Sequence, residues 1–184
     1  MLILTEGASE IEYFYRFRGR NKNIAVIPVQ AKKHDSRNLV LYCASKVHEY
    51  GIDFGDGDTV SVVIDVDDRS ADELRDIEAQ CMKKGFRLYL SNRSFECWLI
   101  LHFRKLTKPM NQDELEMILS ECIGRKYKKS EGIGKDIGDS DILSAIERAE
   151  ELVNGDEDNS AVCYTMNPST TVHRLVKIII SGSA

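Results

Sequence analysis

The sequence predicts an α/β fold, with a mainly parallel four-stranded sheet flanked by helices and a helical C-terminal part. Strand-like and helix-like segments alternate over about the first 90 residues. The run TVSVVID at 59–65 is almost continuously apolar and β-branched, which is typical of a strand covered on both faces. Beyond residue 103 only helical periodicity is visible. We therefore expect one domain over 1–184, made of an α/β core at 1–103 and a helical extension at 104–184 packed on it.

Four short apolar segments bounded by turn residues are the expected strands. Each is too short for a typical helix and rich in β-branched or aromatic residues. They are MLILTEG at 1–7, NIAVIPV at 23–29, TVSVVID at 59–65 and FRLYL at 86–90.

Amphipathic segments separate these strands. Ser9 with Glu12, and Ser70 with Glu73, have the spacing of a capping box, in which a hydroxyl and a carboxylate satisfy backbone N–H groups at a helix start. A glycine closes each segment, as is common at helix ends. The expected helices are 9–19, 36–51 and 70–85.

The rest of the chain is expected to be helical. The segment SNRSFECWLILHF at 91–103 turns helical, and its aromatic spacing predicts that Phe95, Trp98 and Leu99 pack on the sheet. His102 is then either an interior histidine or a ligand. Asn167-Pro168 has the pattern of a helix start. Further helices are expected at 111–124, 140–153 and 169–180.

Composition narrows the class of protein. No apolar run approaches the roughly 18 residues of a membrane span, so a soluble, cytoplasmic protein is expected. The five cysteines are scattered and form no CxxC pair, which predicts small core residues rather than a zinc site or a disulfide framework.

Positive charge is concentrated in two places although the formal net charge is −5. Seven basic residues lie between Arg16 and Arg37, and a second run, RKYKK, spans 125–129. Each is either a solvated surface or a track for a phosphate backbone. Within the second run, Tyr127 either lies in a solvated loop or stacks on a base.

Carboxylates follow two of the predicted strands. Glu6 ends the first strand, and Asp65 and Asp67 end the third, where alternation directs both side chains the same way. Sites in parallel sheets form beyond the carboxyl ends of strands. If the two strands are neighbours, the three carboxylates converge and repel one another unless a cation neutralises them.

A magnesium ion is one explanation of this cluster, because carboxylates are hard oxygen ligands. The alternative is structural. Acidic residues are common in turns and at helix starts, and DVDDRS at 65–70 precedes a predicted helix.

Several motifs resemble a known family. Glu6 in LILTEG with the DVDD run at 65–68 resembles the Toprim domain of topoisomerases, primases and related nucleases. The segments SNRSFECWLILHF and NPSTTVHRLV, at 91–103 and 167–176, look like the RloB family, Toprim-like proteins associated with restriction and abortive-infection loci. The resemblance covers nearly the whole chain and implies a Toprim-like, Rossmann-like fold.

The resemblance also implies roles for acidic residues. Glu6 would be the catalytic glutamate, as a metal ligand or proton shuttle, and Asp65 and Asp67 would be catalytic metal ligands. Asp68 and Glu96 are the further candidates for a second ion. The implied cofactor is one or two Mg²⁺ or Mn²⁺ ions.

Basic and amide side chains near this edge are the predicted substrate-binding set. Arg93 stands where the family commonly has proline, which implies either a looser loop or an arginine that holds a phosphate. The family's glycine-and-proline loop after the second strand reads here as QAKKHDSR. The set comprises Lys32, Lys33, Asn92 and Arg93.

The expected function is metal-dependent hydrolysis of phosphodiester bonds in DNA or RNA, in a prokaryotic phage-defence or restriction-associated system. One alternative is a non-catalytic metal- or nucleotide-binding subunit of an ATPase, because the chain has no GxxxxGK loop of its own and the family implies an ATPase partner encoded nearby. Another is a phosphatase or phosphotransferase with an aspartate nucleophile. No membrane partner is expected.

Overall fold

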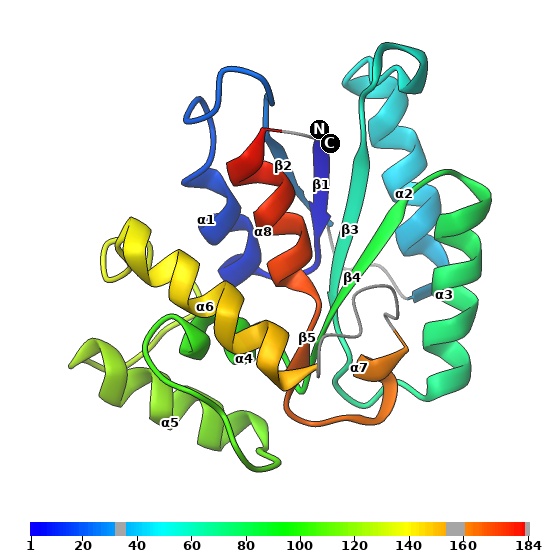
Figure 1. Cartoon of the computed structure of the whole chain (residues 1–184). Helices are drawn as coiled ribbons and strands as arrows, with labels where there is room; N and C mark the ends of the chain where they lie inside the picture. The colour runs from blue at the N-terminus through cyan, green and yellow to red at the C-terminus, as the bar shows by residue number, and fades with distance from the viewer. Residues whose placement is uncertain (32–35, 154–160, 183–184) are drawn as a thin grey trace.

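A computed structural model describes residues 1–31, 36–153 and 161–182. Its centre is a five-stranded sheet in the order β2-β1-β3-β4-β5 (Figure 1). The first four strands are parallel, namely β1 (Leu2–Thr5), β2 (Ile27–Gln30), β3 (Val60–Asp65) and β4 (Arg87–Asn92). The α/β class and the mostly parallel sheet are thus confirmed.

The prediction of four strands was wrong, because a fifth strand, β5 (Ser169–Thr170), pairs antiparallel with β4. This strand has only two residues, and neither is apolar, so it produces no strand periodicity. The Ser91 and Thr170 hydroxyls lie 2.9 Å apart and join the two strands. Asn167-Pro168 leads into β5 and does not start a helix; the last helix, α8 (Val172–Ser181), begins at Val172 after its N-cap Thr171.

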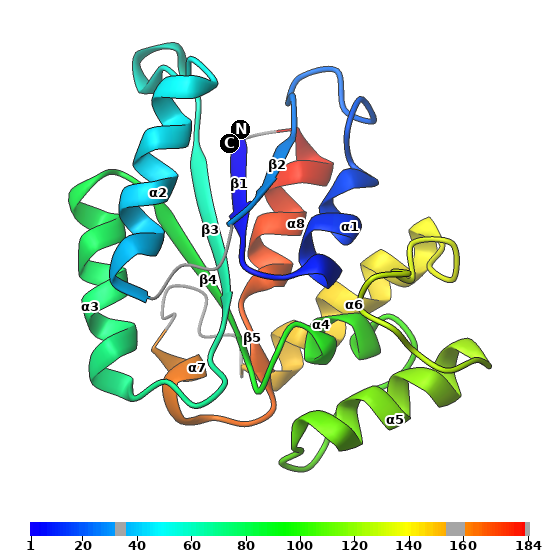
Figure 2. The same ribbon diagram turned by 180° about the vertical axis from the view of Figure 1, so that it is seen from behind.

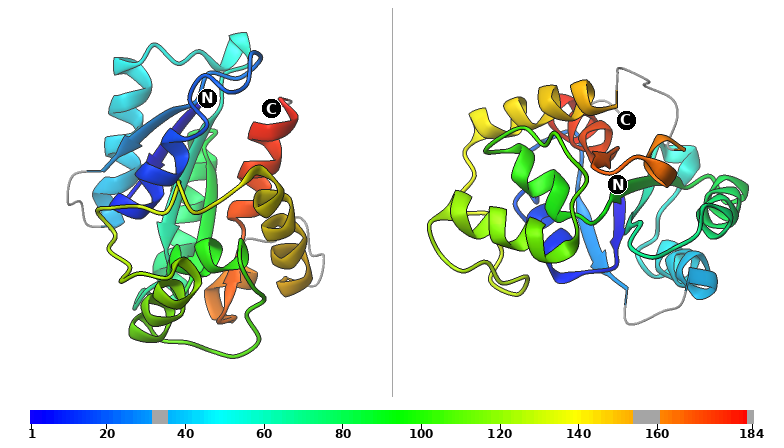
Figure 3. Two further views of the ribbon diagram at one scale, coloured as in Figure 1. Left: turned by 90° about the vertical axis from the view of Figure 1, so that its left-hand side faces the viewer. Right: turned by 90° about the horizontal axis from the view of Figure 1, so that it is seen from below.

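Helices cover both faces of the sheet (Figures 1 and 2). On one face lie α2 (Ser36–Glu49), α3 (Ala71–Lys83) and the short α7 (Val162–Thr165). On the other lie α1 (Ala8–Tyr15), α4 (Glu96–Leu101), α5 (Gln112–Ile123), α6 (Asp139–Leu152) and α8. The right-hand view of Figure 3, from below, shows α4, α5 and α6 grouped on one side of the sheet.

The sheet separates two apolar clusters. Val62 and Ile64 of β3 lie in the cluster beneath α2 and α3, whereas Val63 lies in the cluster beneath α1 and α8. All three side chains are buried. This arrangement confirms that β3 is covered on both faces, as its continuous apolar run predicts.

The local signals at helix ends were partly correct. Ser70 and Glu73 form the expected capping box of α3: the Ser70 hydroxyl accepts from the Glu73 N–H at 3.2 Å, and the Glu73 carboxylate accepts from the Ser70 N–H at 2.8 Å. The predicted start of α1 at Ser9 was wrong. That helix begins at Ala8 because the Glu10 carboxylate accepts from the N–H of its N-cap, Gly7, at 3.1 Å.

The five cysteines are free, and all except the half-buried Cys122 are fully buried, which confirms their role as small core residues. Phe95, Trp98 and Leu99 are buried as predicted. Over the three described ranges, no helix is both long and apolar enough to cross a bilayer.

Candidate functional site

The carboxyl ends of β1 and β3 lie side by side, because the two strands are neighbours and Thr5 pairs with Val63. Glu6 follows β1 directly, and Asp65 is the last residue of β3. Burial raises the pKa of Glu6, and the negative charge of Asp67 adds to this shift. The structure therefore brings Glu6, Asp65 and Asp67 to one edge, the carboxyl edge of the sheet.

Arg69 links the two strand ends. Its guanidinium donates to the Glu6 carboxylate at 2.6 Å and to the Asp65 carbonyl oxygen at 2.6 Å. Both charged side chains are about four-fifths buried. The positive charge of Arg69 opposes the rise in the Glu6 pKa, so part of the negative charge at this edge is neutralised within the protein.

The Asp65 carboxylate is aimed toward the start of α4. Its Oδ1 accepts from the Phe95 N–H at 2.7 Å. Burial raises the pKa of Asp65 well above its usual range, and the charges of Glu10 and Glu96 act in the same direction. The charges of Glu10 in α1 and Glu96 in α4 therefore oppose the ionisation of Asp65 at the end of β3. We call Glu10, Asp65 and Glu96 the acid cluster.

Glu10 was missed in the sequence. It lies in the first turn of α1, is 3% exposed, and has a pKa raised to about 7 by burial and by the charge of Glu96. Two signals could have identified it: it stands three residues after the N-cap, and the helix starts immediately beyond the strand that carries Glu6.

Glu96 is completely buried, and each of its two carboxylate oxygens accepts two hydrogen bonds. Burial opposes its ionisation, but the charge of Lys129 and several hydrogen bonds together lower its pKa. Glu96 Oε1 accepts from Tyr127 at 2.8 Å and from Ser9 at 3.2 Å, and Oε2 accepts from Ser94 at 2.6 Å and from Gln112 at 3.3 Å.

The position of Tyr127 contradicts both predictions made for it within the RKYKK run. Its side chain is 4% exposed, so it lies neither in a solvated loop nor where a base could stack on it. Two residues further on, Lys129 Nζ lies 3.5 Å from Glu96 Oε1. A basic run that looked like surface charge on the sequence is thus partly turned inward, because it has a buried acid to contact.

Asp67 and Asp68 form the exposed rim of the site. Asp67 has a left-handed φ of 47°, which aspartate tolerates better than most residues, and its N–H donates to the Arg93 carbonyl at 3.0 Å. Asp68 pairs with Arg93 at 2.6 Å while its own side chain remains 91% exposed. The loops after β3 and β4 are therefore joined at the rim.

Of the remaining predicted residues, those that the structure describes lie in the interior. Asn92 is buried, and its amide donates to the Cys163 carbonyl at 2.9 Å, which ties β4 to α7. Lys32 and Lys33 lie outside the described residues. His102 is an interior histidine: its ring bonds to the Tyr13 hydroxyl at 3.1 Å, and burial lowers its pKa to about 4.

Comparison with known proteins identifies the family. The model of the family described as RloB-like protein matches residues 1–179. This chain belongs to the RloB-like family. No curated protein and no solved structure matches it.

The residue types at the carboxyl edge of this RloB-like protein fit a hard divalent cation, since the donors are carboxylate oxygens. The side chains are not arranged as a ready-made ligand set. Across the described part of the chain, no three His, Cys, Asp or Glu side chains converge as metal ligands. Glu6 is paired with Arg69 and Glu96 with Lys129, so a metal ion would have to compete with these cations.

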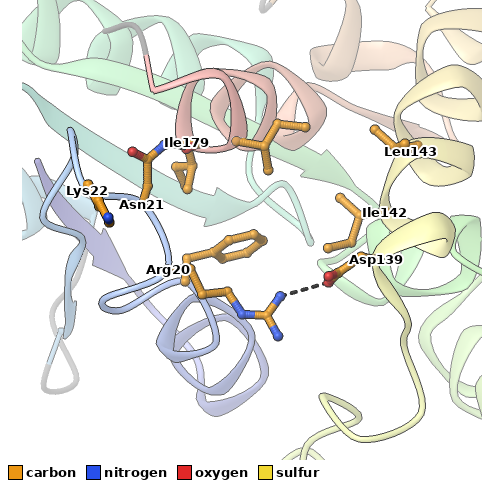
Figure 4. Close-up of a pocket in the computed structure, with 9 residues that line it drawn as sticks. Arg20, Asn21, Lys22, Asp139, Ile142, Leu143 and Ile179 are labelled. Atoms are coloured by element: carbon orange, nitrogen blue, oxygen red, sulfur yellow. Dashed lines mark hydrogen bonds and ion pairs between the residues drawn. The ribbon is translucent and has the colours of Figure 1, made fainter.

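A cavity of about 610 Å³ in the RloB-like chain is separate from this edge. Phe17, Ile142 and Ile179 line it, and Arg20 reaches across its mouth to Asp139 at 2.8 Å (Figure 4). The cavity lies between the end of α1, the start of α6 and the end of α8, whereas the acid cluster lies at the start of α1. The chemistry of the acid cluster therefore does not extend into it.

Proposed function

We propose that this RloB-like protein hydrolyses phosphodiester bonds of nucleic acid with Mg²⁺ or Mn²⁺ at the carboxyl edge of the sheet. One observation carries the proposal: β1 and β3 are neighbours, so Glu6 and Asp65 emerge at one edge of the sheet, where burial first, and then the charges of Glu10 and Glu96, raise the pKa of Asp65. Such crowding is typical of functional sites, because it is costly unless a cation or a proton relieves it.

The residues have distinct proposed roles. Asp65, Glu10 and Glu96 would hold the metal from within the fold, and the rim aspartates, Asp67 and Asp68, would contact it directly or through water. A divalent ion bound there supplies Lewis-acid stabilisation to a phosphodiester. Glu6 acts as general base or general acid, a role that its raised pKa favours because the proton is exchanged closer to neutral pH.

Two arginines support these roles. Arg69 holds the Glu6 carboxylate in place. Arg93 is only 28% exposed, but its partner, Asp68, is a solvent-exposed carboxylate, and such exposed pairs are weak. Arg93 can therefore exchange Asp68 for a substrate phosphate. Lys32, Lys33 and Asn92 remain predicted members of the substrate-binding set.

The test is a hydrolysis assay with single-stranded and duplex DNA and RNA in Mg²⁺ or Mn²⁺. Asp65→Ala should abolish cleavage. The matched control is Asp72→Ala, because Asp72 is 91% exposed and pairs with Arg75 of the same helix. Cleavage that survives Asp65→Ala would refute the proposed mechanism.

A second candidate is a non-catalytic metal- or nucleotide-binding subunit of an ATPase. The pairing of Glu6 and Glu96 with basic side chains favours this candidate, since it leaves the edge stable without a metal. Absence of cleavage with every metal and substrate, together with copurification of an ATPase encoded nearby, would support it. With either function, we propose that the protein works in a phage-defence or restriction-associated system. The resemblance to the RloB family supports this role, and a phage-plating assay with Asp65→Ala would test it.

A further inference from the structure

The segment between α5 and α6 closes one side of the acid cluster. It is held down by the buried side chains of Tyr127, Ile133 and Ile137. Arg125 and Asp136 pair across it at 2.7 Å. The chain around Lys129 is thus anchored on both sides, and the lysine side chain is presented to the acid cluster from a defined position.

Lys129 bridges the buried acids and the solvent. Its Nζ lies 3.5 Å from Glu96 Oε1; the Glu96 side chain is 1% exposed, while that of Lys129 is 46% exposed. Burial disfavours the charged ammonium, but the charges of Glu96, Asp65 and Glu10 outweigh burial and raise its pKa. The same ammonium acts to lower the pKa of Asp65 and of Glu10, against the larger effect of burial.

The charges of the cluster do not balance with Lys129 alone. Lys129 contacts Glu96, and the second nearby cation, Arg69, is committed to Glu6, so among the described residues neither the Glu10 nor the Asp65 carboxylate has a basic side chain in direct contact. Lys129 lies beyond hydrogen-bond distance of Glu96 and is held by charge. A lysine on a flexible four-carbon stem can leave such a pair without disturbing the backbone that carries it.

We propose that Lys129 is the internal counter-ion of the acid cluster and sets its affinity for divalent cations, because Mg²⁺ or Mn²⁺ binds only as the ammonium withdraws from Glu96. This inference rests on the proposed function and adds a residue to it. Lys129 is a positioning residue: it keeps the carboxylates together in the metal-free protein and weakens metal binding by competition.

The experiment compares Lys129→Gln with wild-type protein by isothermal titration calorimetry with MnCl₂ alone, and by thermal unfolding in EDTA. Removing a competing positive charge next to Glu96 should tighten Mn²⁺ binding at least about tenfold. Without metal, the variant should unfold at a lower temperature, since its buried carboxylates have lost their cation. Adding Mn²⁺ should then raise its unfolding temperature more than that of the wild type.

Two variants control this comparison. Lys128→Gln removes a neighbouring charge that pairs with the exposed Glu131, so the Mn²⁺ affinity and the unfolding temperature should both stay at wild-type values. Lys129→Arg keeps the charge and should bind Mn²⁺ with nearly wild-type affinity.

The outcomes distinguish this inference from the proposed function. Mn²⁺ affinity or metal-free stability that is the same in Lys129→Gln and Lys128→Gln would overturn the role of Lys129 and leave the metal site standing. Absence of Mn²⁺ binding in every variant would overturn the proposed function, and the inference with it.

Discussion

Tyr127→Phe should destabilise the protein, although it removes a single oxygen atom. The Tyr127 hydroxyl donates to the buried Glu96 carboxylate at 2.8 Å and lies 2.7 Å from the Ser9 hydroxyl. Hydrogen bonds to a charged group contribute about 1.5–3 kcal/mol to the free energy of unfolding. For a chain of this size, that loss corresponds to a fall of about 3–12 °C in Tm.

Urea denaturation at neutral pH in EDTA would measure this loss. The matched control is Tyr50→Phe, because Tyr50 is 44% exposed at the end of α2, where a substitution should change the free energy of unfolding by less than about 0.5 kcal/mol. The m-values should stay equal if only stability changes.

The effect of Tyr127→Phe should also depend on pH. The pKa of Glu96 lies below its ordinary value of 4.5 in the folded protein, so the ionised carboxylate stabilises the fold above pH 4.5, and this stabilisation is lost as the pH falls through the folded pKa. The difference between Tyr127→Phe and wild type should therefore narrow in acid. Equal stability of the Tyr127 and Tyr50 variants at neutral pH would refute the described network around Glu96.

Three further substitutions test other parts of the structure. Because the pKa of Glu10 rises from 4.5 to about 7 on folding, the free energy of unfolding of the metal-free protein should fall as the pH rises across that interval, by roughly 3 kcal/mol at most. In urea titrations at a series of pH values, Glu10→Gln should reduce this dependence of the free energy of unfolding on pH. Asp65→Asn keeps the acceptor for the Phe95 N–H but removes a charge that burial disfavours, so it should raise Tm in EDTA while abolishing hydrolysis; a lower Tm would contradict the raised pKa of Asp65. Trp98→Ala should cost about 3–5 kcal/mol in chemical denaturation because Trp98 is completely buried, whereas Met82→Ala, at a position 72% exposed, should cost less than about 0.5 kcal/mol.

The strands and helices of the α/β core were largely predictable. A strand such as β3 can be recognised from its own residues, since a run of β-branched apolar residues is buried wherever the sheet forms. The capping box of Ser70 and Glu73 is equally local, because both partners lie within one helical turn. By contrast, β5 has two polar residues and becomes a strand only because β4 is present to pair with it.

The α/β class, the helix-capping and core positions such as Ser70 and Trp98, and the carboxylates after two strands can all be deduced from the order of the amino acids. These features depend on periodicity and on neighbours within a few residues. The folded arrangement, in contrast, is needed to see that Glu10 and Glu96 act on Asp65 and that Tyr127 and Lys129 turn inward to contact Glu96. Such contacts join residues far apart in the chain, as Ser9 and Tyr127 do over 118 positions, and their energies arise from burial and charge, which exist only once the chain has folded.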